Sequence, residues 1–187
     1  VDFELLSGEV HALLGENGAG KSTLIKCLTG VHHKDAGTIL LCGKKITPTS
    51  PEAAIEMGIS TVFQEINLCQ NLTVAENIFV GRQPMKRDGR IDWKTINKRA
   101  EELLVRFNIH IDVTRPLDFY STGIQQMVSI ARAVDVKAKI LILDEPTSSL
   151  DENEVERLFD VVKELKASGM GIIFITHFLD QVFAISD

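Results

Sequence analysis

The chain has 187 residues, of which 44% are apolar and 25% are charged, a composition typical of a packed globular domain rather than a disordered segment. Its 20 basic and 26 acidic residues give a net charge of −6. Nucleic acid is therefore not an expected partner, because affinity for phosphate backbones comes mostly from lysine and arginine. No apolar run approaches the ~20 residues that a membrane-spanning helix needs.

The first third of the chain alternates between short strands and helices. Residues 1–6 and 10–14 are expected to form a hairpin around Ser7-Gly8, the second arm being a buried strand. A helix over residues 51–57 is indicated by Ser50 as N-cap, by proline at its first position and by a following glycine. The other expected elements are a helix over residues 21–28, a hairpin of residues 38–41 and 44–46, and a strand over residues 59–63.

The middle third has helical periodicity and a local excess of positive charge. Helices are expected over residues 73–80 and 92–107, the second with Asp92 as N-cap. Residues 82–106 hold eight basic and four acidic side chains, which is a net +4 within an acidic chain. Two interpretations stay open: a solvated helical face, or a contact surface for a partner.

The last third returns to alternating strands and helices. Residues 140–143 and 172–175 are apolar at every position, which is typical of strands buried on both faces. A long helix over residues 151–167 lies between them, with Asp151 and Glu154 spaced as a capping box. This alternation predicts an α/β fold with a mostly parallel core sheet that is flanked by helices.

A phosphate-binding loop follows the strand of residues 10–14. Residues 15–22 fit the P-loop pattern G-x-x-x-x-G-K-[ST] between a strand and a helix. Glycines let backbone N–H groups approach phosphate oxygens, the Lys21 ammonium can reach the β- and γ-phosphates, and the Ser22 hydroxyl can bind Mg²⁺. A glycine-rich turn that binds nothing is the alternative. The candidate nucleotide-binding residues are Gly15, Asn17, Gly18, Ala19, Gly20, Lys21, Ser22 and Thr23.

Two adjacent acids end the strand of residues 140–143. In open α/β sheets, ligands bind at the carboxyl ends of the strands, where Asp144 and Glu145 are expected. Asp144 would hold Mg²⁺, and Glu145 would act as general base on the attacking water. The alternative is a polar strand end that merely enters a turn at Pro146.

Four further segments, together with the P-loop and the acids, resemble the ATP-binding-cassette family along the whole chain. Gln64 stands where the family has its Q-loop glutamine, and residues 121–125 stand where it has the signature motif. Residues 148–151 match the D-loop, and His177 matches the switch histidine. Singly, each segment has a plain structural explanation, such as a helix cap at Ser121 or Asp151. Their shared order and spacing carry the resemblance.

The resemblance implies a role for each matched residue. Gln64 would contact Mg²⁺ or the attacking water, and His177 would contact the γ-phosphate. Ser121 and Gly123 would face the γ-phosphate of the nucleotide held by an opposite cassette, and Asp151 would cross the interface between cassettes. The implied catalytic set is Glu145, His177, Lys21 and Gln64, the nucleotide contacts also include Ser121, Gly123 and Asp151, and the implied metal ligands are Ser22, Gln64 and Asp144.

The signature segment departs from the family pattern of Leu-Ser-Gly-Gly-Gln. Tyr120 replaces the leucine, Thr122 the first glycine and Ile124 the glutamine, while Ser121 and Gly123 are kept. Threonine cannot adopt glycine-only backbone angles cheaply. The composite site that uses this segment is therefore expected to be weaker than its twin, as in an asymmetric ATPase.

Several longer segments resemble the first cassette of bacterial monosaccharide importers with two fused cassettes, such as GENGAGKSTLIKCLTG, QQMVSIARAV and THFLDQV. The implied protein is a peripheral ATPase at the cytoplasmic face of the plasma membrane. It binds ATP and Mg²⁺, its partners are a second cassette and integral membrane permease subunits, and a sugar-binding protein acts on it indirectly. A soluble ATPase acting on ribosomes or DNA, and a non-catalytic nucleotide-binding half, are the alternatives.

The family resemblance also implies a domain organisation. The chain would be a single nucleotide-binding domain that is truncated at both ends. Residues 1–66 and 138–187 would form the ATP-binding core with a partial antiparallel β subdomain, and residues 67–137 would form an inserted helical subdomain.

Overall fold

The computed structural model describes residues 2–16, 18–64, 67–136 and 138–187. Within it the chain divides into two compact units. The first unit comprises Val1–Gln64, Val136–Ser148 and Val162–Asp187, and the second comprises Glu65–Asp135 and Ser149–Val161. The predicted helical subdomain, residues 67–137, overlaps the second unit, which further includes residues 149–161.

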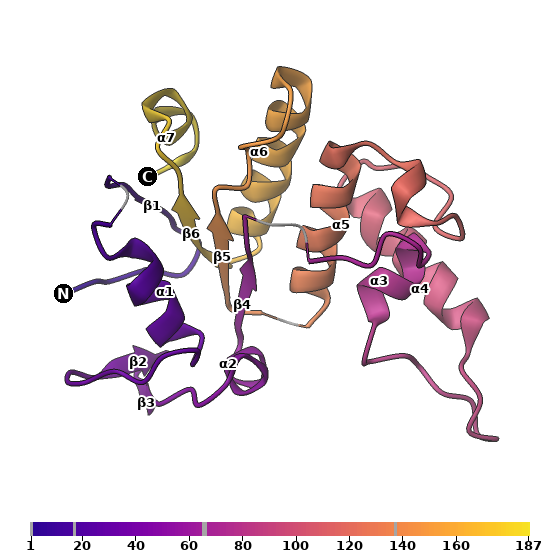
Figure 1. The fold of residues 1–187 in the computed structure, drawn as a ribbon, viewed down its shortest axis with the longest axis horizontal. Helices are drawn as coiled ribbons and strands as arrows, with labels where there is room; N and C mark the ends of the chain where they lie inside the picture. The colour runs from indigo at the N-terminus through magenta and orange to yellow at the C-terminus, as the bar shows by residue number, and fades with distance from the viewer. Residues whose placement is uncertain (1, 17, 65–66, 137) are drawn as a thin grey trace. The chain divides into compact units, whose positions relative to one another are not determined.

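A four-stranded parallel sheet forms the centre of the first unit (Figure 1). Its strand order is β1-β6-β5-β4, so the chain crosses over between all neighbouring strands. The predicted α/β fold with a mostly parallel sheet is confirmed. The strands are β1 (Val10–Leu13), β4 (Ile59–Val62), β5 (Ile140–Asp144) and β6 (Gly171–Ile175).

The carboxyl ends of these strands are level with one another. On either side of β6, Ile175 is in register with Leu13 of β1 and with Asp144 of β5. Val62 of β4 is in register with Leu143 of β5. Because all the strands run in the same direction, the segments that follow them leave from one edge of the sheet.

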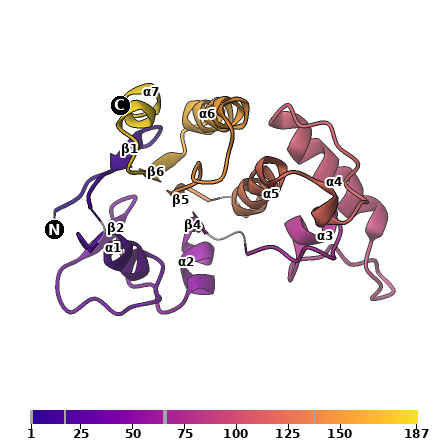
Figure 2. The same ribbon diagram turned by 45° about the horizontal axis from the view of Figure 1, so that its top comes forward.

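Helices cover both faces of the sheet, as the alternation of side chains along a strand requires. Ile142, Ile173 and Ile175 belong to a buried cluster with Ile25 of α1 (Lys21–Leu28) and Ala54 of α2 (Pro51–Met57). Figure 2 shows α1 and α2 on one face of the sheet and α7 (Leu179–Ile185) on the other.

The hairpin of β2 (Ile39–Leu41) and β3 (Lys44–Ile46) forms a separate two-stranded antiparallel sheet, as predicted. The helix α2 that follows is also as predicted, because the Ser50 hydroxyl accepts a hydrogen bond from the N–H of Ala53 at 3.2 Å. Gly58 ends the helix with a left-handed backbone, φ 102°.

The predicted hairpin of residues 1–6 and 10–14 is wrong. Residues 2–6 form no strand, whereas β1 is present. Glu9 explains the difference, because its carboxylate accepts a hydrogen bond from the N–H of Leu6 at 2.5 Å and its own N–H donates to the Leu6 carbonyl at 3.3 Å. Both backbone groups of Leu6 are thereby used in a local turn instead of a strand ladder.

The second unit is helical in its described residues. It contains α3 (Val74–Phe79), α4 (Trp93–Arg106), a short 3₁₀ helix η1 (Leu117–Phe119), α5 (Thr122–Asp135) and the first part of α6 (Glu152–Ala167). Asp92 caps α4, as predicted, by accepting from the N–H of Thr95 at 3.2 Å. A capping box of Thr73 and Glu76 begins α3.

Part of the basic charge of the middle third is neutralised within the second unit. Asp135, at the end of α5, pairs with Arg82 at 2.7 Å and with Arg99 of α4 at 3.0 Å. The Arg82 guanidinium also donates to the carbonyl of Ile78 at 2.8 Å. These pairs tie three helices together, so a share of this charge has a structural role.

Among the described residues, no helix combines the length and the apolar character that crossing a membrane requires.

Candidate functional site

The loop after β1 turns sharply and leads directly into α1. Gly18 and Gly20 have φ values of 87° and 94°, a region that side chains with a Cβ rarely adopt. Gly20 stands at the N-cap of α1, and no side chain among the described residues caps this helix end. The unpaired N–H groups and the positive end of the helix dipole are therefore available to an anion. Ala19 belongs to this described loop, and Asn17 lies outside the described residues.

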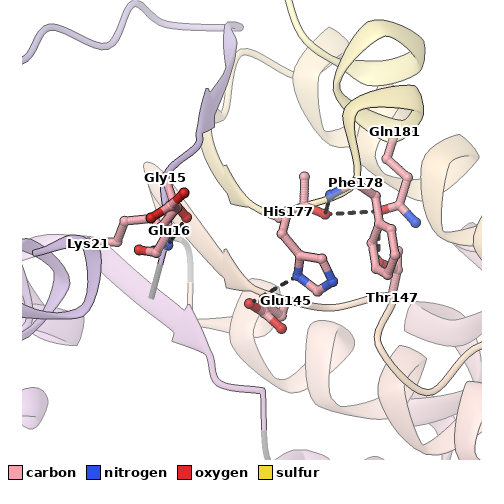
Figure 3. Close-up of polar contacts among 9 residues, drawn as sticks. Gly15, Glu16, Lys21, Glu145, Thr147, His177, Phe178 and Gln181 are labelled. Carbon is pink, nitrogen blue, oxygen red and sulfur yellow. Dashed lines mark hydrogen bonds and ion pairs between the residues drawn. The ribbon is translucent and has the colours of Figure 1, made fainter. Parts of the chain in front are cut away.

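Lys21, the first residue of α1, bends back over this loop. Its ammonium donates to the carbonyls of Gly15 at 2.5 Å and Glu16 at 3.2 Å (Figure 3). Both partners are neutral, so the positive charge is not cancelled within the loop. Ser22 and Thr23 follow in the first turn of α1, and both are exposed.

Asp144 ends β5 at the same edge of the sheet and is half-buried. Its pKa is raised above the usual aspartate value, first by burial and second by the neighbouring charge of Glu145. Lys21 acts in the opposite direction and lowers the pKa. A carboxylate that is desolvated beside another acid favours a cation as its ligand.

Glu145 and His177 face each other where β5 and β6 end (Figure 3). Nδ1 of His177 lies 3.4 Å from Oε1 of Glu145. Glu145 has a φ of 46°, which is uncommon for a residue other than glycine, and its N–H donates to the carbonyl of Ile175 at 3.0 Å. The structure therefore brings the predicted base and the predicted switch histidine into contact.

Gln64 follows β4 by two residues and is exposed. Since Val62 is in register with Leu143 of the neighbouring strand, Gln64 leaves the sheet at the edge where Asp144 ends β5. One edge thus gathers the P-loop, Gln64, the two acids and His177.

A set of hydrogen bonds that the sequence does not predict connects α7 to the segments that follow β5 and β6. Oε1 of Gln181, on α7, accepts hydrogen bonds from the hydroxyls of Thr147 at 2.8 Å and Thr176 at 3.2 Å. The Thr176 hydroxyl accepts from the N–H of Phe178 at 3.1 Å. Thr147 and Thr176 are buried, at 5% and 2% exposure.

The signature residues lie in the second unit, at the start of α5. The Ser121 hydroxyl donates to Oε1 of Glu154 at 3.0 Å and accepts from the N–H of Ile124 at 3.4 Å. A Cβ built on Gly123 would lie 2.1 Å from the carboxyl group of Glu154. A side chain at position 123 would therefore displace the Glu154 carboxyl group from its present place.

Asp151 immediately precedes α6 in the same unit, and it forms the predicted capping box with Glu154. Oδ1 of Asp151 accepts from the N–H of Glu154 at 2.8 Å, and Oε2 of Glu154 accepts from the N–H of Asp151 at 3.2 Å. The spacing of the two acids predicts this box, but no pattern in the sequence indicates the contact between Glu154 and Ser121.

The donor groups near the loop suit a magnesium ion that a nucleotide brings with it. The described residues contain no group of three or more His, Cys, Asp or Glu side chains that could hold a metal ion. The Ser22 hydroxyl and the Asp144 carboxylate are oxygen donors, and Mg²⁺ is commonly held by one or two protein oxygens together with substrate phosphates. This donor set fits Mg²⁺.

Curated relatives match the whole chain. It is 55% identical over 187 residues to the galactofuranose transporter ATP-binding protein YtfR of Escherichia coli (strain K12), and covers 37% of that protein. It is 50% identical to the fructose import ATP-binding protein FruK of Bifidobacterium longum, covering 36% of it. It is 47% identical to the ribose import ATP-binding protein RbsA of Geobacillus kaustophilus, covering 38% of it. The full chain thus spans little more than a third of these relatives.

Solved structures match the fold. CbiO1 of Clostridium perfringens, part of the ABC transporter complex CbiONQ, aligns with a TM-score of 0.84 and 32% identity, over 100% of this chain and 74% of the other. An ATP-binding cassette of an ABC transporter in its ADP conformation aligns with a TM-score of 0.83 and 29% identity, over 97% and 75% of the two chains.

The resemblance inferred from the motifs is confirmed by the family comparison. The model of the ABC transporter family matches residues 1–148, and the P-loop, Gln64 and the acids of β5 lie within that match. Members of this family bind nucleotide, which agrees with the loop and helix geometry described above. The chain belongs to the ABC transporter family of ATP-binding cassettes.

Proposed function

We propose that this chain is an ATP-binding and ATP-hydrolysing cassette that powers the import of a monosaccharide. The observation that carries the proposal is the level edge of the parallel sheet, where one unit holds the P-loop, Asp144, Glu145 and His177. A nucleotide-binding module without catalysis has no need of an acid and a histidine in contact beside the phosphate loop.

The residues of the edge divide the work of phosphoryl transfer to water. The Lys21 ammonium exchanges its carbonyl partners for β- and γ-phosphate oxygens, and the N-terminus of α1 stabilises the same charge. Glu145 accepts a proton from the attacking water, and His177 donates a hydrogen bond to the γ-phosphate. Gln64 orients the water from the neighbouring strand end. Little covalent chemistry is required, so positioning and charge stabilisation dominate.

Mg²⁺ would be held by the Ser22 hydroxyl and Asp144, with Gln64 as a further oxygen donor, and would neutralise charge on the phosphates. Its positive charge would offset the burial of the Asp144 carboxylate beside Glu145, which raises the pKa of Asp144.

The proposed partners follow from the names of the relatives. YtfR, FruK and RbsA are ATP-binding proteins of sugar transporters, and each is more than twice as long as this chain. We infer a second cassette in the same assembly and integral membrane permease subunits, with this chain peripheral at the cytoplasmic face of the membrane. A sugar-binding protein would act only through the permease. The names differ in their sugar, so the proposal goes no further than a monosaccharide.

The rival function is a nucleotide-binding half without catalysis, which the departures at Tyr120, Thr122 and Ile124 favour. These residues lie in the second unit and serve an opposite cassette's nucleotide in the family scheme. The intact contact of Glu145 with His177 favours hydrolysis at this chain's own P-loop.

Phosphate release from MgATP by the assembled importer tests the proposal. Lys21→Ala is compared with Lys26→Ala, an exposed lysine in the last turn of the same helix. We expect phosphate release to fall strongly in Lys21→Ala alone. Equal rates in the two variants and the wild type would refute ATP hydrolysis at this P-loop.

A further inference from the structure

One amide oxygen ties together the two segments that carry Glu145 and His177. Oε1 of Gln181 accepts the protons of two hydroxyls, that of Thr147 at 2.8 Å and that of Thr176 at 3.2 Å. Thr147 follows Glu145 by two residues, and Thr176 immediately precedes His177. The helix α7 that carries Gln181 thus contacts both strand-end segments through one side-chain atom.

The hydroxyl protons of this group are both paired. Each threonine hydroxyl has one proton, and both are donated to Gln181. The Thr176 oxygen accepts in addition from the N–H of Phe178 at 3.1 Å, so a bonded residue stands on each side of His177. Both hydroxyls are almost completely buried, at 5% and 2% exposure of their residues, so losing their shared acceptor would leave buried donors unpaired.

The backbone at Glu145 has a conformation that surrounding contacts must hold in place. Its φ of 46° lies in a region that costs free energy for a residue with a Cβ, and strained conformations persist only where the surroundings fix them. Two backbone bonds hold the turn, from Glu145 N–H to the Ile175 carbonyl at 3.0 Å and from Ser148 N–H to the Glu145 carbonyl at 3.3 Å. The Thr147 side chain adds a further hydrogen bond, which it donates to Gln181.

We propose that Gln181 is a positioning residue for ATP hydrolysis, which fixes the Glu145 and His177 segments in mutual register through Thr147 and Thr176. This inference rests on the proposed function, since it assigns the Glu145–His177 pair a catalytic task. Gln181 does not touch the nucleotide; it acts through the two threonines.

The proposal predicts an effect on turnover and none on nucleotide binding. The P-loop and Lys21 make no hydrogen bond to this group in the described structure, so the KM for ATP stays near the wild-type value. Removing the acceptor frees two segments that carry reacting groups, and kcat falls roughly tenfold, as expected for a loss of alignment rather than of a reacting group.

The test is steady-state ATP turnover by the assembled importer with two substitutions at position 181 and one control substitution at position 180. Gln181→Met keeps the length of the side chain and removes the acceptor. Gln181→Glu keeps an acceptor oxygen for both hydroxyls. Asp180→Asn changes the exposed neighbour on α7 and serves as the matched control. We expect kcat to fall in Gln181→Met, to be largely restored in Gln181→Glu and to be unchanged in Asp180→Asn.

A second pair of variants keeps the test decisive if Gln181→Met folds poorly. Thr147→Val conserves shape and deletes one of the two hydroxyls, and it should lower kcat by severalfold without raising KM. Because both substitutions remove the same bond, adding Thr147→Val to Gln181→Met should cost no further activity. Losses that multiply would overturn the proposal, as would wild-type kcat in Gln181→Met or equal loss in Gln181→Met and Gln181→Glu.

Including Lys21→Ala separates a failure of the positioning role of Gln181 from a failure of the proposed function. If turnover depends on Lys21 but not on Gln181, the positioning role fails and the proposed function stands. If turnover does not depend on Lys21, the proposed function itself fails.

Discussion

The sheet edge of the first unit and the signature segment of the second unit present contrasting surfaces to an anion. At the sheet edge, the hydrogen bonds that Lys21 makes within the described residues go to neutral carbonyls, and its charge lowers the pKa of Asp144 without a direct ion pair between the two in that part of the chain. In the signature segment, the hydroxyl proton of Ser121 is already given to the carboxylate of Glu154. The Glu154 carboxylate also lies against Gly123, so its negative charge already stands beside this glycine.

The two regions therefore differ in which existing hydrogen bonds must break before a phosphate can bind. In the P-loop, Lys21 has only to exchange its hydrogen bonds to neutral carbonyls for bonds to phosphate oxygens. In the signature segment, the hydrogen bond of Ser121 to the Glu154 carboxylate has to break, and because this bond is exposed it contributes about 1 kcal/mol or less. We therefore expect nucleotide affinity to be set by the first unit, and the second unit to contribute only where an opposite nucleotide is present.

Replacing the proposed base tests the catalytic half of this comparison and has the largest expected effect. Glu145→Gln removes proton acceptance while keeping the size of the side chain, so ATP hydrolysis should fall roughly 1000-fold. MgATP binding should be retained, because Lys21 and the loop are unchanged. Single-turnover phosphate release measures the first quantity and equilibrium titration the second. Wild-type hydrolysis in this variant would show that Glu145 is not the base.

Substituting the signature glycine tests the independence of the second unit. In Gly123→Ala the new Cβ displaces the Glu154 carboxyl group and breaks its bonds to Ser121 and Asp151. Losing the carboxylate half of the capping box should lower the free energy of unfolding by about 0.5 kcal/mol, since Asp151 still accepts from the N–H of Glu154. Urea denaturation measures this loss, and MgATP affinity should not change. In a Glu154→Ala background the same substitution should have little further effect; an undiminished loss would mean that Gly123 accommodates something other than Glu154.

The smallest expected effect concerns the burial of Asp144. Its pKa is raised in the folded chain, so the folded state binds this proton more tightly than the unfolded state. Stability should therefore fall as pH rises from the ordinary aspartate pKa of 3.8 through the raised value. Asp144→Asn should remove this pH dependence and slightly raise the melting temperature at neutral pH, while weakening Mg²⁺-dependent nucleotide binding. A lower melting temperature in the variant would contradict the assigned cause.

Local signals in the sequence predict most elements of this fold. Ser50 with a following proline places α2, Asp92 places the start of α4, and the fully apolar runs place β5 and β6. Each of these signals acts between neighbours along the chain, so no knowledge of the rest of the structure is required. The predicted hairpin of residues 1–6 failed because a side chain, Glu9, competes for backbone groups that the alternation pattern assigned to a ladder.

The candidate site likewise combines parts that the sequence predicts with contacts that it does not predict. The P-loop and the acids of β5 are contiguous motifs, and the parallel sheet brings them to one edge. The contact of Gln181 with Thr147 joins residues 34 positions apart, and that of Ser121 with Glu154 joins residues 33 positions apart. A glutamine on an amphipathic helix and a glutamate in a capping box have no pattern that reveals such partners, since the contacts depend on how the elements pack.

Calorimetric titration of this chain with MgATP tests the central comparison most directly, with wild type, Lys21→Ala, Lys26→Ala and Gly123→Ala measured under the same conditions. We expect Lys21→Ala to weaken binding roughly 100-fold, because charge-assisted bonds to two phosphates are lost, and we expect the other two variants to match the wild type. Equal binding by Lys21→Ala and the wild type, or a comparable loss in Gly123→Ala, would contradict the claim that the sheet edge of the first unit alone sets nucleotide affinity.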